Sequence, residues 1–257
     1  MNDTALPPVR LHRAGQGSTL LLLHCLGVDR NMWSLAAAGL DAHFTLITCD
    51  FPGHGEAAPA AGAYDIAALS RQIAAGLDAL GTGAVHVGGI SLGGLVAQHL
   101  AATRPELVDR LILIDTTPRY TDEMRANWAE RAAIARSSGV GGMSGALLSI
   151  WFTAEAIAAN GPAVRYVREC FANADGQAYA RACEALAGAD LRPLAARIAA
   201  PTLVVCGEQD IPSFIDAARW LAGAIAGAQP CWLGPARHAS VLEQPDAFVA
   251  AARRFLG

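Results

Sequence analysis

The sequence has 257 residues, of which 53% are hydrophobic, and a formal net charge of −4. This composition supports a large buried core and excludes an intrinsically disordered chain. Every basic residue is an arginine and none of them form a run, so we do not expect a nucleic-acid partner.

The first eight residues, Met1–Pro8, lack the charged start and the apolar run of a signal peptide. No apolar stretch reaches the roughly 18 residues that a membrane span needs. The six cysteines form no CxxC pair and no spacing typical of a metal site. We therefore expect a cytoplasmic protein with free thiols, no metal and no membrane partner.

Short apolar runs alternate with longer stretches of helical periodicity. The runs that we interpret as strands are Leu20–His24, Thr45–Cys49, Val85–Gly88, Arg110–Ile114, Thr202–Cys206 and Gln229–Leu233. The stretches that we interpret as helices are Ile66–Leu80, Leu92–Thr103, Ile215–Ala226 and Pro245–Leu256. Almost wholly apolar strands separated by helices predict an α/β fold, with a mostly parallel central sheet and helices on both faces.

One segment interrupts this alternation. From Thr121 to Ala189 the sequence has helical periodicity and glycine punctuation, but no strand-like run. An insertion between two strands of such a sheet usually lies over the strand ends, where ligands bind. We therefore predict a single domain over residues 1–257, with a helical cap at about residues 118–190.

The strongest motif is Gly-Ile-Ser-Leu-Gly-Gly at residues 89–94, which fits the pattern Gly-x-Ser-x-Gly. A predicted strand enters it and a predicted helix leaves it, as a nucleophile elbow requires. The tight turn needs small residues two places on either side of the serine, and the helix N-terminus favours developing negative charge. The pattern predicts Ser91 as a catalytic nucleophile, with a plain glycine turn as the alternative.

A base for this serine is expected after the last strand. His238 lies there, in the loop that follows Gln229–Leu233. Histidines before Ser91 come too early for the chain order serine, acid, histidine. We predict His238 as the general base, and the alternative is a solvated loop histidine.

The acid that orients this base should lie between Ser91 and His238 in the sequence. Asp210 follows the strand Thr202–Cys206 within a Gly-Glu-Gln-Asp turn, and Asp115 follows the earlier strand Arg110–Ile114. The turn suits a side chain directed towards the histidine loop. We favour Asp210 and keep Asp115 as its rival.

Two backbone amides are needed to stabilise an oxyanion. The amide of Leu92, directly after the nucleophile, is one candidate. The amide of Leu26, in the loop after the first strong strand, is the second. Neighbouring Cys25 has no base assigned to it, so a reactive thiol is the weaker interpretation.

Several longer stretches match one family. The most specific is Tyr-Ala-Arg-Ala-Cys-Glu-Ala-Leu at residues 179–186, and others lie at residues 26–33, 89–94, 151–153, 189–193 and 238–245. On these stretches the chain resembles the 3-oxoadipate enol-lactonase family of the α/β-hydrolase superfamily over nearly its whole length. The resemblance implies an α/β-hydrolase fold in which Ser91, Asp210 and His238 form the triad.

The resemblance also implies a reaction. Members of that family hydrolyse a small carboxylated enol-lactone in aromatic catabolism, so we expect an acyl-enzyme mechanism that uses no cofactor. Two positions differ from the family pattern: Pro52 stands where an arginine is typical, and Ala57 where a serine is typical. His54, in the same loop, is interpreted as structural.

A carboxylated substrate needs a cation or several hydrogen-bond donors, because burying an unpaired carboxylate is costly. Arg119, at the start of the predicted cap, is the candidate cation, although a surface ion pair explains it equally well. Trp128 and Trp151 are candidates for the pocket wall, with packing inside the cap as the alternative.

Other functions remain open on the sequence alone. A general carboxylesterase, a carbon–carbon bond hydrolase and a perhydrolase would all use the same scaffold. A ligand-binding receptor that retains the fold belongs to a different class. An intact serine, acid and histidine set argues against that last function, since a binding protein has no need of a strained elbow.

Overall fold

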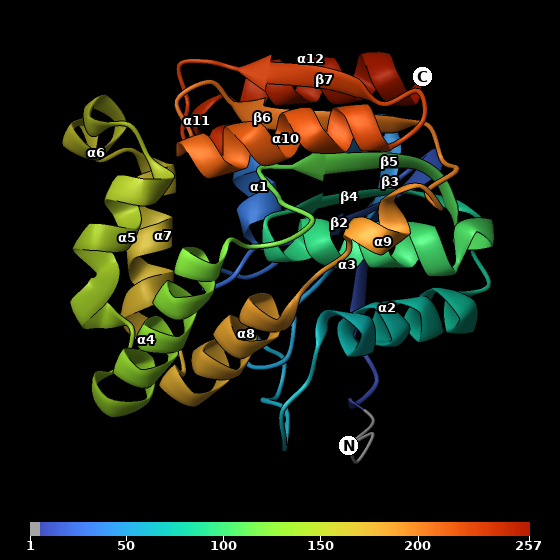
Figure 1. Cartoon of the computed structure of the whole chain (residues 1–257). Helices are drawn as coiled ribbons and strands as arrows, with labels where there is room; N and C mark the ends of the chain where they lie inside the picture. The colour runs from blue at the N-terminus through green and yellow to red at the C-terminus, as the bar shows by residue number, and fades with distance from the viewer. Residues whose placement is uncertain (1–5) are drawn as a thin grey trace.

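The computed structural model describes residues 6–257, so the first five residues of the segment Met1–Pro8 lie outside the described residues. A seven-stranded sheet with the order β1-β3-β2-β4-β5-β6-β7 crosses the molecule (Figure 1). The strands are β1 Leu11–Gly15, β2 Ser18–Leu23, β3 Phe44–Cys49, β4 Val85–Ile90, β5 Val108–Ile114, β6 Thr202–Gly207 and β7 Gln229–Leu233. Only β1 pairs antiparallel, and the expected mostly parallel sheet is confirmed.

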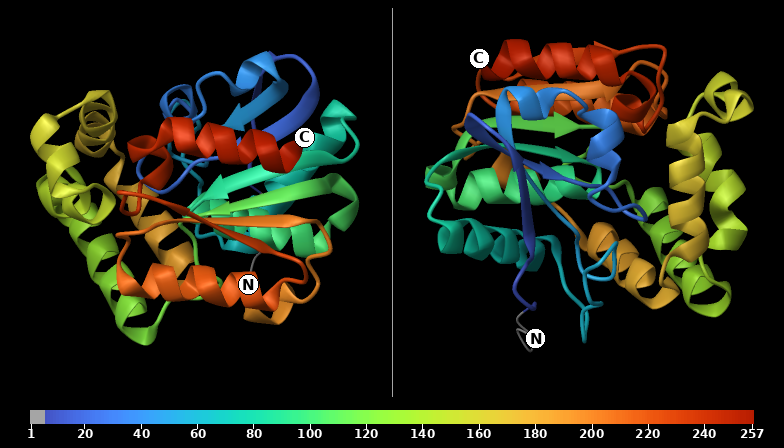
Figure 2. Two further views of the ribbon diagram at one scale, coloured as in Figure 1. Left: turned by 90° about the horizontal axis from the view of Figure 1, so that it is seen from above. Right: turned by 180° about the vertical axis from the view of Figure 1, so that it is seen from behind.

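Helices cover both faces of this sheet, as expected (Figure 2). One face carries α1 Met32–Ala36 and α12 Pro245–Leu256, and the other carries α2 Ile66–Leu80, α3 Leu92–Thr103 and α10 Pro212–Ala224. Short helical turns in the connections are α9 Arg192–Ala195, α11 Ser240–Glu243, η1 Leu40–Ala42 and η2 Pro105–Leu107. No helix of the described chain is long and apolar enough to cross a membrane.

A helical cap lies between β5 and β6 in the sequence, at the end of the sheet to which the parallel strands point (Figure 1). Its elements are α4 Asp122–Ser138, η3 Gly141–Met143, α5 Ser144–Trp151, α6 Ala154–Ala159, α7 Pro162–Asn173 and α8 Gly176–Gly188. The segments by which the chain enters and leaves the cap pair through an isolated antiparallel β-bridge between Arg119 and Asp190. Helices α4 and α8 pack against each other along much of their length.

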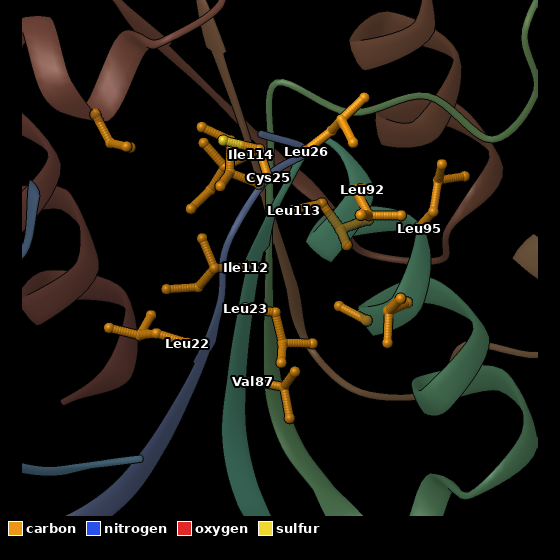
Figure 3. Close-up of a cluster of buried hydrophobic side chains, with 14 of the residues drawn as sticks. Leu22, Leu23, Cys25, Leu26, Val87, Leu92, Leu95, Ile112, Leu113 and Ile114 are labelled. Carbon is orange, nitrogen blue, oxygen red and sulfur yellow. The ribbon is translucent and has the colours of Figure 1, made fainter. Parts of the chain in front are cut away.

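The core below the cap follows from the apolar strands. Successive residues such as Leu22 and Leu23, or Ile112 and Leu113, point to opposite faces of the sheet (Figure 3). Leu23 and Leu113 face α3, which contributes Leu92. All five side chains are fully buried. Burying both faces of the central strands fixes the sheet rigidly, so the loops at the strand ends have firm anchors.

Strand β1 was missed because its residues are only half-buried or exposed and lack the apolar run of the central strands. An edge strand needs only one partner, here β3, and shows a weaker sequence pattern. Helix α10 begins at Pro212, three residues before the expected start at Ile215. Proline is favoured in the first turn of a helix, which explains the earlier boundary.

Candidate active site

The turn between β4 and α3 places Ser91 in a backbone conformation that non-glycine residues rarely adopt, with φ 51° and ψ −110°. The glycines on either side are required by close contacts. A Cβ atom on Gly89 would lie 2.2 Å from the carbonyl oxygen of Gly93, and one on Gly93 would lie 2.3 Å from that of Leu23. The motif therefore folds as the elbow that its spacing predicts, with the serine at a helix N-terminus.

Three side chains from distant parts of the chain form a hydrogen-bonded row at this elbow. His238 Nε2 lies 3.2 Å from Ser91 Oγ, and His238 Nδ1 lies 2.9 Å from Asp210 Oδ2. A carboxylate only accepts, so Nδ1 carries the proton and Nε2 is free to accept from the serine hydroxyl. All three residues are buried. The structure thus brings Ser91, His238 and Asp210 together in the order that acyl transfer requires.

The electrostatics of His238 come from two opposing effects. Burial lowers its pKa, while the charge and the hydrogen bond of Asp210 raise it, and the net pKa lies above the ordinary value. Asp115 adds a smaller raising contribution, and Arg131 a lowering one. The imidazolium that would form during proton transfer is therefore stabilised from the side of Asp210.

Asp115, the rival acid, does not contact the histidine ring. Its Oδ1 accepts a hydrogen bond from the amide of Gly207 at 2.9 Å, and its Oδ2 accepts from the amide and the hydroxyl of Ser240 at 3.1 and 2.6 Å. Burial and the nearby Asp210 raise the pKa of Asp115 to about 7. The structure places Asp210, and not Asp115, against His238.

The two candidate oxyanion donors lie beside Ser91, the candidate nucleophile. Leu92 is the first residue of α3, so its amide has no acceptor within the helix. Leu26 lies in the loop after β2 and lines the same cavity as Ser91. Within residues 6–257 neither amide donates to a backbone carbonyl in the connecting loops. Both are available to a developing oxyanion.

A cavity of about 130 Å³ lies between the serine and the cap. Its apolar wall includes Leu26, Met124, Trp128, Ile150, Trp151 and Phe214. Its polar lining consists of Ser91, Asn127, Arg131, Tyr179 and His238. Both tryptophans named from the sequence therefore reach the cavity, one from α4 and one from α5. The ring of Phe214 packs 4.2 Å from that of His238 and helps to hold it.

The expected substrate-binding role of Arg119 needs correction. Arg119 does not line the cavity and instead forms ion pairs with Asp122 at 2.6 Å and Asp190 at 3.9 Å, at the base of the cap. The side chains of Asp122 and Asp190 are 87% and 35% exposed, so the surface ion pair that the sequence left open is the arrangement observed. The guanidinium is neutralised before any ligand arrives.

The cation at the cavity is Arg131, which the sequence analysis did not single out. Its guanidinium lies 4.4 Å from the centre of the Trp128 ring, a cation–π distance. Among the described residues no carboxylate forms an ion pair with it. Positions three apart share a helix face, so the spacing from Trp128 is the sequence signal by which Arg131 could have been found.

Comparison with known proteins agrees with this geometry. Residues 18–245 match the model of the alpha/beta hydrolase fold family. The chain belongs to the α/β-hydrolase family. It is 32% identical to 3-oxoadipate enol-lactonase 2 of Acinetobacter baylyi, over 89% of this chain and 85% of that protein. It is also 33% identical to a pimeloyl-[acyl-carrier protein] methyl ester esterase of Chromobacterium violaceum, over 92% and 93% of the two chains.

Among solved structures, the enol-lactonase from Burkholderia xenovorans superposes on this α/β-hydrolase with a TM-score of 0.91. The two chains are 34% identical, and the match covers 96% of each. The resemblance to enol-lactonases noted in the sequence is thereby confirmed. The protein is a hydrolase of the ester or lactone class.

Two further residues considered in the sequence, Cys25 and His54, lie in surroundings that favour a structural role. Cys25 is buried, and burial raises the pKa of its thiol, which opposes a reactive thiolate. His54 is also buried, its Nδ1 lies 3.2 Å from the carbonyl oxygen of Pro52, and burial lowers its pKa to about 3. His54 is therefore neutral, and its hydrogen bond lies within its own loop, which fits the structural role expected of it.

The loop that lacks the typical arginine at Pro52 is anchored by another one. Arg30, from the loop after β2, forms ion pairs with Asp50 and with Glu56. Its backbone amide also donates to Asp50 at 2.7 Å. Pro52 itself does not line the cavity at Ser91. With Pro52 in place of the arginine, the loop is still anchored by Arg30, and the cavity at Ser91 loses no cation.

Proposed function

We propose that this hydrolase opens a small carboxylated enol-lactone, such as 3-oxoadipate enol-lactone, through an acyl-enzyme on Ser91. The observation that carries this proposal is the guanidinium of Arg131, which has no carboxylate partner among residues 6–257 and lines a cavity that also contains Ser91 and His238. The similarity to enol-lactonases supports it.

The size and charge of the cavity restrict the substrate. About 130 Å³ is well below the ~300 Å³ or more of sites for drug-sized ligands, so a small ring is favoured. Arg131 offers a planar fork of donors that matches a carboxylate. Trp128 and Trp151 supply apolar surface for the ring of the substrate. A small lactone with a free carboxylate satisfies all three conditions.

Acylation begins when Ser91 Oγ attacks the ring carbonyl carbon. His238 Nε2 takes the hydroxyl proton, and Asp210 stabilises the resulting imidazolium. The amides of Leu26 and Leu92 donate to the oxyanion. When the tetrahedral intermediate collapses, the imidazolium of His238 donates its proton to the ring oxygen, which leaves as an enol and stays attached to the acyl chain because the substrate was cyclic. The enol then becomes a ketone.

Deacylation reverses the roles. His238, neutral again, takes a proton from water, which attacks the ester carbonyl of the acyl-enzyme. The serine oxygen leaves and recovers its proton from His238, and an oxo-acid is released. Each step uses groups of the chain and water, so the proposed reaction involves a small-molecule substrate and no cofactor.

The setting of the reaction is part of the proposal. Similarity to enol-lactonases favours a step in aromatic catabolism. All six cysteines, which lie in the described range, are free, as suits a reducing cytoplasm.

The test compares an enol-lactone carrying a free carboxylate with its methyl ester. We expect ring opening, followed by ultraviolet absorbance, to have a kcat/KM about 10- to 100-fold higher for the acid, because the ester leaves Arg131 without its anion. p-Nitrophenyl acetate, which has no carboxylate, serves as the control for the acyl-transfer machinery. Equal kcat/KM for acid and ester would leave a general carboxylesterase.

A further inference from the structure

Asp115 is a fully buried carboxylate that the proposed chemistry does not use. It follows β5 directly and has a φ of 41°, which is unusual for a residue with a side chain. A strained backbone persists only where the surroundings over-determine it. The surroundings of Asp115 are the three segments that carry Ser91, Asp210 and His238.

The side chain of Asp115 joins two of these segments. Gly207, whose amide donates to Oδ1 at 2.9 Å, is the last residue of β6 and precedes Asp210 by three positions. Ser240, whose amide and hydroxyl donate to Oδ2 at 3.1 and 2.6 Å, follows His238 by two positions. One carboxylate thus connects the acid-bearing turn to the base-bearing loop.

The backbone around Asp115 joins the third segment. The carbonyl of Ile114 accepts from the amide of Ser91 at 2.9 Å, and the hydroxyl of Thr116 donates to the carbonyl of Ser91 at 2.8 Å. The amide of Asp115 itself donates to the carbonyl of Val205 in β6, at 2.9 Å. Residues 114–116 therefore contact every segment that supplies a member of the hydrogen-bonded row.

We propose that Asp115 is a positioning residue that holds Asp210 and His238 in register with Ser91. Its side-chain hydrogen bonds fix the separation of the acid turn and the histidine loop, and its backbone neighbours fix both to the serine elbow. In this role Asp115 contacts neither the substrate nor the proton that is transferred between Ser91 and His238. This proposal rests on the roles proposed for the three residues of the row.

The charge of Asp115 gives this role a measurable signature. Facing its carboxylate are the Asp210 carboxylate, the Cys206 sulfur, the His238 ring and the donors of Gly207 and Ser240. Its negative charge is one of the groups that raise the pKa of His238. Because the pKa of Asp115 is itself about 7, its carboxylate is only partly ionised where His238 titrates, so removing the charge lowers the pKa of His238 by a small amount.

The test is Asp115→Asn, with Asp109→Asn as the matched control. Asp109 lies on the same strand β5, but its side chain is 57% exposed. Activity is measured on p-nitrophenyl acetate, with the burst amplitude giving the fraction of active sites. For Asp115→Asn we expect kcat to fall about 10- to 100-fold at full burst amplitude, because a displacement of about 1 Å costs that much, with KM nearly unchanged.

The pH profile provides the second readout. The acidic limb of kcat/KM should move to lower pH in Asp115→Asn, by about a few tenths of a unit, and stay in place in Asp109→Asn. A folded Asp115→Asn with wild-type kcat and an unmoved limb overturns the proposal. A loss of activity that equals the loss in burst amplitude also overturns it, because it would mean only that fewer sites are active.

Ser240→Ala gives a milder version of the same test if Asp115→Asn fails to fold. It removes one of the three donors to Asp115, and we expect a kcat loss of about 3- to 10-fold at full burst amplitude. An unchanged kcat in Ser240→Ala then overturns the proposal. Because every readout uses a simple ester, failure of the lactone proposal leaves this test intact.

Discussion

The strand-end loops and the cap of this hydrolase contribute different things. The loops after β4, β6 and β7 carry Ser91, Asp210 and His238, held by a sheet whose central strands are buried on both faces. Cap helix α4 carries Trp128 and Arg131, and most of its residues are exposed. In the proposed mechanism, the loops therefore hold the reacting groups in fixed geometry, while the cap supplies the surface that the substrate would contact.

This difference separates chemistry from selectivity. A change in the loops alters interactions that form with every ester or lactone, so its effect appears in kcat for all substrates. A change in the cap alters contacts with one part of one substrate, so its effect depends on that part. This distinction is wrong if a loop variant slows one substrate far more than another, or if a cap variant lowers kcat equally for all substrates.

The largest effect is expected for the nucleophile and the base. Ser91→Ala and His238→Ala should each lower kcat about 10⁴-fold or more, on p-nitrophenyl acetate and enol-lactone alike, without loss of folding. Steady-state kinetics and circular dichroism measure the two properties. Activity within tenfold of wild type in Ser91→Ala would move the nucleophile elsewhere.

Asp210→Asn comes next. An asparagine cannot hold the imidazolium charge, and it permits the wrong tautomer of His238, so kcat should fall about 10³- to 10⁴-fold. The loss should clearly exceed that of Asp115→Asn, measured side by side on the same ester. The opposite order would mean that Asp115 is the acid of the row.

Arg131→Gln tests the cap. We expect kcat/KM for the carboxylated lactone to fall about 10- to 100-fold, since a charge-assisted hydrogen bond to a buried carboxylate contributes about 1.5–3 kcal/mol. Hydrolysis of p-nitrophenyl acetate should stay within about twofold. Arg119→Gln is the matched control, because its guanidinium pairs with Asp122 and Asp190. Equal losses in the two variants would remove Arg131 from substrate recognition.

The smallest effect concerns pH. His238 must be neutral to accept a proton, and its pKa lies above the ordinary 6.5. Activity should therefore rise with pH along an acidic limb whose midpoint exceeds 6.5, as a kcat/KM profile would show. In Asp210→Asn the residual activity should have its midpoint at lower pH, because the main raising contribution is gone. A midpoint below 6 in the wild type would contradict the assigned electrostatics.

Much of the loop region could be predicted because its pattern is local. Helices Ile66–Leu80 and Leu92–Thr103 and strand Gln229–Leu233 have the expected bounds, since apolar periodicity and a cap or glycine mark their ends. The serine motif needs its two glycines for reasons that act within a few residues. Because these steric requirements involve residues close together in the sequence, the elbow could be predicted from the motif alone.

The cap was harder for a physical reason. Helix α4 carries six charged residues at irregular spacing, and they do not mark which face covers the cavity. The orientation of α4 is set by its packing on α8, a tertiary contact between residues about 50 positions apart. Arg119 was chosen because it follows a strand, yet Asp122 and Asp190 take its charge at the cap base.

The most direct test of the central claim is the mass of the acyl-enzyme. The hydrolase is mixed with the carboxylated enol-lactone, quenched in acid within milliseconds, digested and analysed by mass spectrometry. Opening a lactone releases no fragment, so the peptide containing Ser91 should gain the full mass of the substrate, and no gain should occur in Ser91→Ala. Product formation without any adduct on Ser91 in the pre-steady state, or an adduct on another residue, would contradict the account.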